Sequence, residues 1–102
     1  MIVSQPQLLL LLLEHNYEKD NHVVSESITE QGISVELNCT IGYTSCLLKK
    51  NEENGYIYRT KLKIINGTRN RYVFFLTDTG LELAREIKNI IVKRKLNNNK
   101  FK

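Results

Sequence analysis

The stretch TEQGISVELNCTIGYTSCLLKKNEENGYI, residues 29–57, decides the fold of this chain. A threonine hydroxyl can accept a hydrogen bond from a free amide in the first turn of a helix, so Thr29 and Thr40 are each suited to cap one. Apolar residues recur at four-residue spacing after Thr29, which predicts a short helix over residues 30–37. A second helix follows Thr40 and stops at Gly55, because glycine readily adopts the left-handed conformation that ends a helix. Two helices joined by a short connection form a helix-turn-helix.

The sequence that follows changes from a helical to an extended pattern. Residues 56–65 and 71–76 are rich in β-formers and flank the dipeptide Asn66-Gly67, which is a strong local signal for a hairpin. Thr77 is then suited to cap a last helix. The apolar stripe of that helix is Leu83, Ala84, Ile87, Ile90 and Ile91. A hairpin placed directly after a helix-turn-helix is typical of a wing.

The N-terminal helix is expected to open at Ser4 and Pro6 and to run to about Asn16. Its consecutive leucines, Leu8–Leu13, sweep the whole circumference of a helix. One side can pack on the domain's own core, whereas the other side needs a second cover. A partner subunit is the simplest cover, although the long last helix could also wrap it. The residues predicted at a dimer surface are Leu8, Leu9 and Leu12 of the first helix, with Ile87 and Ile91 of the last.

These elements define one small domain of the α+β class, mainly α. We expect a winged helix-turn-helix with a three-helix core, a two-stranded β wing, a C-terminal helix and a short strand within residues 23–28. Residues 1–96 form this domain, with the first and last helices as its dimer surface, and residues 97–102 form a polar, basic tail. A chain of 102 residues has no room for a second domain with its own core.

Charge is distributed unevenly along the chain, although its net charge is only +4. Residues 1–39 carry one lysine against six carboxylates, whereas residues 40–76 carry seven Lys and Arg against two carboxylates. An acidic front and a basic back favour a polyanionic partner. Residues 85–102 are also basic. Cations near the end of a helix are favoured by the helix dipole alone, so we give this last segment a structural role.

The segments TSCLLKKNEENGYI (44–57) and LTDTGLELAREI (76–87), with the hairpin between them, resemble archaeal and bacterial winged-helix transcription regulators of the MarR-like kind. The resemblance implies a dimeric regulator that binds double-stranded DNA, and we expect an archaeal source. Two positions depart from the family. Asn51 stands where a large apolar residue usually seats the recognition helix, and Cys46 stands where a basic residue often faces DNA.

The resemblance and the charge pattern together predict a sequence-specific transcription regulator with its recognition helix in the major groove. Thr44, Leu47 and Leu48 are expected to face the core, which leaves the opposite face of that helix for DNA. The recognition-helix residues predicted to contact DNA are Thr40, Gly42, Tyr43, Ser45, Cys46 and Lys49. The wing residues predicted to contact the minor groove or phosphates are Lys61, Lys63, Asn66, Arg69, Asn70 and Arg71. Tyr43 could instead prop the turn as a half-buried aromatic residue.

Other functions have less support in the sequence. A winged-helix protein-interaction or RNA-binding module is the main alternative, with the leucine-rich helix as its contact surface. An enzyme is not expected, because His15 and His22 are the only histidines and no phosphate loop, metal motif or carboxylate pair occurs. No cofactor or metal is therefore expected, and the sequence leaves open whether a small-molecule effector exists.

The cysteines indicate which thiol chemistry to expect, and the hydropathy pattern indicates the cellular compartment. Cys39 and Cys46 lack a second pair for a zinc site, so free thiols are expected, with a thiol or metal sensor as the less favoured alternative. The longest apolar run ends at Glu14, far short of the roughly 20 residues that cross a bilayer, and no basic segment precedes it. We therefore expect a cytoplasmic protein that does not enter the membrane.

Overall fold

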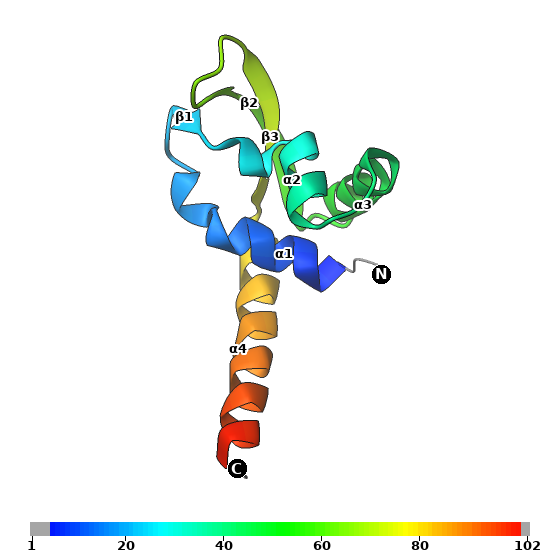
Figure 1. Ribbon diagram of the computed structural model, residues 1–102, viewed down its shortest axis with the longest axis vertical. Coiled ribbons are helices and arrows are strands. Elements are labelled where there is room, and N and C mark those ends of the chain that lie inside the picture. The colour runs from blue at the N-terminus through cyan, green and yellow to red at the C-terminus, as the bar shows by residue number, and fades with distance from the viewer. Residues whose placement is uncertain (1–4, 101–102) are drawn as a thin grey trace.

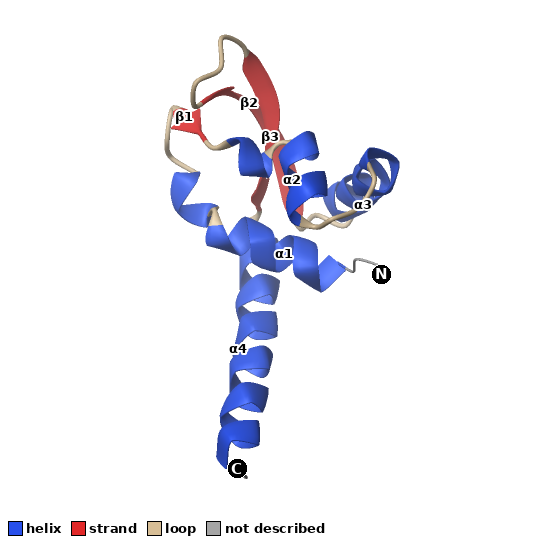
Figure 2. Cartoon of the chain, in the orientation of Figure 1, coloured by secondary structure: helices blue, strands red, loops and turns tan. Residues whose placement is uncertain are grey.

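The computed structural model describes the backbone of residues 5–100 and the side chains of residues 5–94. Figures 1 and 2 show a body of short helices and a small sheet, from which a wing and a long last helix extend in opposite directions. The elements in chain order are α1 (Gln5–Glu14), η1 (Asn16–Glu18), β1 (Val23–Val24), η2 (Glu26–Ile28), α2 (Glu30–Glu36), α3 (Ile41–Glu53), β2 (Ile57–Ile64), β3 (Asn70–Leu76) and α4 (Asp78–Lys100). The predicted mainly helical α+β winged helix is confirmed. No helix in the described range is both long and apolar enough to cross a membrane.

The two helices of the helix-turn-helix start and stop where their caps predict. The hydroxyl of Thr29 accepts a hydrogen bond from the Gly32 amide at 3.1 Å, and the hydroxyl of Thr40 accepts one from the Tyr43 amide at the same distance. Gly55 takes a φ of +77° immediately after the C-cap of α3, which is the conformation that its place in the sequence requires. Local capping chemistry therefore fixes both helices.

The sheet has the order β1-β2-β3, with β1 parallel to β2 and β2 antiparallel to β3. The hairpin closes as predicted, because Asn66 adopts a φ of 64° and the Gly67 amide donates to the Ile64 carbonyl at 2.8 Å. The strand expected within residues 23–28 is only two residues long. After it, the Thr29 amide donates to the Glu26 carbonyl at 3.0 Å and closes a 3₁₀ turn, so the chain leaves the sheet at η2. The Thr29 hydroxyl donates to the same carbonyl at 2.7 Å.

The core lies between α1, the helix-turn-helix and the inner face of the sheet. Among its fully buried side chains are Leu8, Leu9, Leu12, Val24, Ile28, Ile33, Leu48, Val73, Phe75 and Leu76. This placement corrects the predicted dimer surface. Leu8 and Leu9 are 0% exposed and Leu12 is 1% exposed, so their side chains are already covered by their own chain. The helix face that lies outside the core carries Leu10 and Leu13 instead, which are only partly buried.

The last helix begins at the predicted cap and packs closely on the backbone just before β2. The Gly80 amide donates to the Thr77 hydroxyl at 3.1 Å. A Cβ at Gly80 would lie 1.9 Å from the Tyr56 carbonyl oxygen, so only glycine permits this approach of α4. The helical backbone continues to Lys100, past the start of the tail expected at residue 97, and no proline or glycine interrupts residues 81–100. The division of the chain at residue 96 stays a prediction.

Candidate nucleic-acid interface

One face of α3 is buried and the other is exposed, in the orientation that the sequence predicts. Thr44, Leu47 and Leu48 lie in the core. The predicted contact residues are all exposed, namely Thr40, Gly42, Tyr43, Ser45, Cys46 and Lys49. A helix whose inner face is fully packed can present its outer face in a fixed orientation. The geometry required of a recognition helix is therefore present.

Asn51 explains how α3 is seated without the usual apolar residue. Its side chain is 1% exposed, and its Nδ2 donates to the Leu47 carbonyl at 2.8 Å. Its Oδ1 accepts from Nε2 of Gln5 in α1 at 2.9 Å. The amide is thus satisfied on both sides, as a buried polar group must be. A hydrogen bond between α1 and α3 therefore stands where an apolar packing contact was expected from the sequence.

The lysines of the wing share one face of the hairpin with polar and aromatic residues of β3. Lys61 pairs with Tyr72 and Lys63 pairs with Asn70 in the antiparallel register, and directly opposed residues point to the same face. Lys61 Nζ lies 5.0 Å from the centre of the Tyr72 ring. Both lysines are exposed, so the two-residue alternation predicted for β2 holds.

Arg59 extends this basic row toward α3, and sequence reasoning did not select it. Its Nε donates to Oε2 of Glu52 at 2.9 Å, and its Nη2 contacts Oε1 of the same carboxylate. Its Cζ lies 5.4 Å from the Phe74 ring centre and 5.6 Å from that of Tyr72. The hydrogen bond to Glu52 is the main cause that raises the pKa of the Arg59 guanidinium above its ordinary value. The signal in the sequence was the alternation Arg59, Lys61, Lys63 along one strand.

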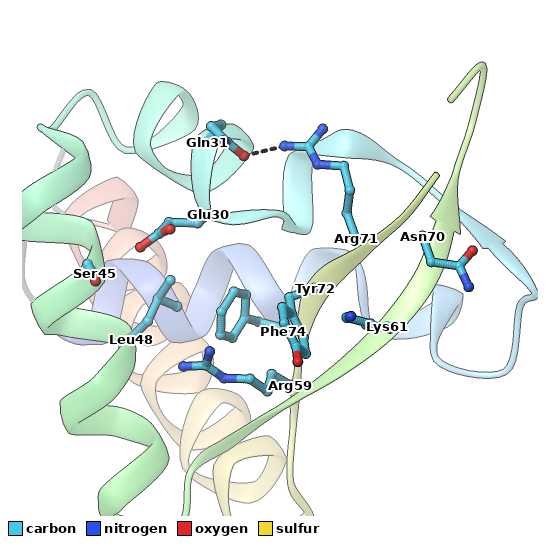
Figure 3. Close-up of a pocket in the computed structure, with 10 residues that line it drawn as sticks. All are labelled: Glu30, Gln31, Ser45, Leu48, Arg59, Lys61, Asn70, Arg71, Tyr72 and Phe74. Atoms are coloured by element: carbon cyan, nitrogen blue, oxygen red, sulfur yellow. Dashed lines mark hydrogen bonds between the residues drawn. The ribbon is translucent and has the colours of Figure 1, made fainter. Parts of the chain in front are cut away.

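The two predicted arginines of the wing differ in their surroundings. Arg71 Nη1 lies 3.3 Å from Oε1 of Glu26 in η2, and its Nη2 donates to Oε1 of Gln31 in α2 (Figure 3). Arg69 is exposed and has no side-chain hydrogen bond or ion pair within residues 5–94. Asn66 and Asn70 are exposed as well. Arg71 is therefore engaged by its own chain, whereas Arg69 extends into solvent.

A hollow of about 470 Å³ joins α3 to the wing. Figure 3 shows it enclosed by the start of α2, the middle of α3 and the wing strands. Its lining residues are Glu30, Gln31, Ser45, Leu48, Arg59, Lys61, Asn70, Arg71, Tyr72 and Phe74. Three cations line this space against one carboxylate. The exposed face of α3 and the basic face of the wing are consequently parts of one surface.

A second, apolar groove of about 300 Å³ lies at the other end of the molecule, between α1 and α4. Its lining residues are Leu10, Leu13, Glu14, Lys88, Ile91 and Val92. Of the two α4 residues predicted at a dimer surface, Ile87 packs partly against the core and Ile91 is 38% exposed in this groove. On the α1 side of the groove, the side chains of Leu10 and Leu13 are partly exposed.

Neither cysteine forms a disulfide. Cys39 and Cys46 are both free, and Cys39 Sγ lies 3.0 Å from the Thr44 hydroxyl, which places it at the base of α3. Among the described residues, no three His, Cys, Asp or Glu side chains gather in a way that could hold a metal ion.

The fold matches solved transcription regulators over nearly the whole chain. MepR, a transcription regulator of the Staphylococcus aureus multidrug efflux pump MepA, is 22% identical, with a TM-score of 0.74 over 96% of this chain and 63% of that one. A MepR–DNA complex is 21% identical, with a TM-score of 0.69 over 100% of this chain and 66% of MepR. A point mutant of Lactococcus lactis ZitR is 23% identical, with a TM-score of 0.61 over 93% of this chain and 59% of ZitR.

These matches confirm the predicted resemblance at the level of the fold. The chain spans slightly less than two thirds of the length of the MepR chains that it matches. The sequence matches no protein-family profile and no curated protein. Both matched regulators come from bacteria, so the expected archaeal source stays a prediction.

Proposed function

We propose that this chain is a sequence-specific, double-stranded DNA-binding transcription regulator. In this proposal α3 enters the major groove and the wing contacts the minor groove or phosphates. The observation that carries it is the shared hollow, which is lined by Ser45 of α3 and by Arg59 and Lys61 of the wing. The structure of a MepR–DNA complex with the same fold supports it.

The exposed cations of the wing supply the part of the affinity that depends on salt. Lys61, Lys63 and Arg69 extend from the hairpin without an acidic partner in the described part of the chain. Each phosphate that a cation neutralises releases counterions and contributes about 0.9 to the slope of log K against log salt. The exposed face of α3 would supply base contacts, since Ser45 and Lys49 can each donate hydrogen bonds to base edges.

We also propose that the active form is a homodimer, with the α1–α4 groove as its interface. Leu10, Leu13, Ile91 and Val92 form a partly uncovered apolar surface, and Glu14 and Lys88 beside them have opposite charges that can pair across a two-fold axis. Burial of this surface in a second copy would be favourable by about 25 cal/mol per Å². Two recognition helices could then reach half-sites about 34 Å apart.

The test of DNA binding compares two double variants that remove equal charge. Lys63→Ala with Arg69→Ala is expected to weaken binding to a selected duplex and to reduce the salt slope by about 1 for each phosphate that is no longer neutralised. Lys93→Ala with Arg94→Ala removes two exposed cations from α4 and should change neither quantity. Fluorescence anisotropy from 50 to 200 mM salt, roughly, measures both. Equal losses in the two variants would mean that only total charge matters.

The competing functions give different results in the same assay. A protein-interaction module would not bind the duplex at any salt concentration, and an RNA-binding module would prefer a structured RNA of equal length. Base readout is checked with Lys49→Ala, which should weaken binding to the selected duplex more than to a random one. Equal weakening on both duplexes would remove α3 from sequence recognition.

A further inference from the structure

We propose that Arg59 and Arg71 are positioning residues that hold the wing at a fixed angle to the helix-turn-helix. The inference rests on the proposed function, because it concerns how the wing is presented to a duplex. It divides the wing arginines, which look equivalent in the sequence, into two that brace the hairpin and one, Arg69, that is left for DNA.

The first brace links β2 to the last turn of α3. The Arg59 guanidinium makes a two-point contact with the Glu52 carboxylate and lies over the rings of Phe74 and Tyr72. The carboxylate contacts this planar guanidinium on one side and the aromatic rings contact it on another, so its orientation is restricted. Because Glu52 belongs to α3, the direction of the strand is tied to the direction of the recognition helix.

The second brace links β3 to the start of α2. Arg71 contacts Glu26 of η2 and Gln31 of α2, so it reaches the other helix of the helix-turn-helix. The position along the hairpin matters here. Val73 and Phe74 are buried, whereas Tyr72 is 50% exposed, so β3 leaves the core at Arg71 and Tyr72. At the same end of the hairpin β2 is still held, because the buried Ile64 pairs with Val24 of β1. β3 is the edge strand, so there the side chain of Arg71 ties it to the helix-turn-helix.

The braces also explain why neither arginine is suited to be a main DNA contact. Nε and Nη2 of Arg59 are used by Glu52, and Nη1 and Nη2 of Arg71 are used by Glu26 and Gln31. A phosphate would have to displace these partners. Lys61, Lys63 and Arg69 have no such partners in the described structure and can neutralise phosphates without breaking an internal ion pair.

The decisive variant is Glu52→Ala, because it breaks the first brace while leaving every cation in place. A positioning role predicts weaker binding even though the net charge becomes more positive. If only about a tenth of the wings keep the competent angle, the apparent Kd rises about tenfold. The slope of log K against log salt should stay unchanged, since no phosphate contact is removed. A directly contacting Arg59, masked by Glu52, predicts the opposite, namely tighter binding and a steeper slope.

Glu53→Ala is the matched control, because Glu53 is the next residue of α3, is exposed and carries the same charge. It should leave the affinity unchanged or raise it slightly. The charge exchange Glu52→Arg with Arg59→Glu restores an ion pair across the same gap and should recover part of the lost affinity. The proposal is overturned if Glu52→Ala binds duplex as well as Glu53→Ala does, or if the exchange variant binds more weakly than Glu52→Ala.

A measurement without DNA separates this inference from the proposed function. Amide hydrogen exchange of residues 57–76 in the free protein should be faster in Glu52→Ala than in the wild type, and unchanged in Glu53→Ala. Gln31→Ala should produce a smaller increase, centred on β3. If the wild type binds no duplex, the proposed function fails while this readout still tests the braces. Unchanged exchange in Glu52→Ala would show that the wing does not depend on Arg59 for its position.

Discussion

The helix–wing face, made of the exposed residues of α3 and the wing, and the α1–α4 groove are built in opposite ways. On the helix–wing face, two of the charged side chains bind partners in their own chain, Arg59 to Glu52 and Arg71 to Gln31. In the α1–α4 groove, apolar side chains such as Leu10 and Ile91 are only partly covered. These two side chains of the helix–wing face are therefore held by contacts within one chain, whereas the apolar side chains of the groove remain partly exposed.

The difference follows from the cost of exposing each kind of group. Charged groups are well solvated at a surface, so weak ion pairs and hydrogen bonds are enough to arrange them there. Each Å² of apolar surface that stays exposed to water costs about 25 cal/mol, and this cost is removed only when other atoms cover the surface. The helix–wing face can therefore be ready for a ligand in the monomer, whereas the apolar groove would be covered only in the proposed dimer.

The largest expected effect tests where the core ends and the groove begins. Leu9 is fully buried and Leu10, the next residue, is only partly buried. We expect Leu9→Ala to lower the free energy of unfolding by about 2–5 kcal/mol. Leu10→Ala should lower it by less than about 1 kcal/mol. Urea denaturation at a concentration that keeps the chain monomeric measures both. Similar losses for the two leucines would mean that the groove is as closed as the core.

The next effect concerns the proposed interface itself. Ile91→Glu places a charge in the α1–α4 groove, where a partner would have to desolvate it, so we expect dimer affinity to fall by about a hundredfold. Ile90→Glu is the control, because Ile90 is more exposed and does not line the groove. Sedimentation should report twice the 11.9 kDa chain mass for the wild type and the single mass for Ile91→Glu. A wild type that sediments as a monomer at micromolar concentration would contradict the dimer.

The sequence was sufficient for those parts of the fold that depend on local chemistry. Thr29, Thr40 and Thr77 each cap a helix as predicted, and Asn66 turns the hairpin, because a cap or a turn is determined by residues within four positions of it. The segment after β1 was harder. Residues 23–28 have strand-forming composition, yet the amide and the hydroxyl of Thr29 both donate to the Glu26 carbonyl, and their second half forms a turn.

The site was only partly predictable, because its details depend on contacts across elements. The exposed face of α3 and the alternation of Lys61 and Lys63 follow from helical and strand periodicity. Periodicity does not say which leucines of an all-leucine run face the core, so Leu8, Leu9 and Leu12 were placed at the wrong surface. It also does not show that Arg71 reaches α2, since that contact joins residues 40 positions apart.

The smallest expected effect tests the hydrogen bond that connects the two regions, from Gln5 of α1 to Asn51 of α3. Asn51→Leu places an apolar side chain of similar size at this buried position. It removes the buried amide together with its need for partners, and partly exposed Gln5 can turn toward water. The free energy of unfolding should therefore change by less than about 1 kcal/mol. Asn51→Ala leaves a cavity in the same place and should lower it by about 1–3 kcal/mol.

Urea denaturation of both Asn51 variants measures the difference, and duplex binding by Asn51→Leu shows whether α3 keeps its orientation. Unchanged affinity means that shape alone seats α3 on α1, so the two regions are joined by packing. If Asn51→Leu is as unstable as Asn51→Ala, the hydrogen bond is specifically needed. A polar contact would then be needed in the part of the molecule that contains α1 as well as on the helix–wing face. The two regions would differ less than their exposed side chains indicate.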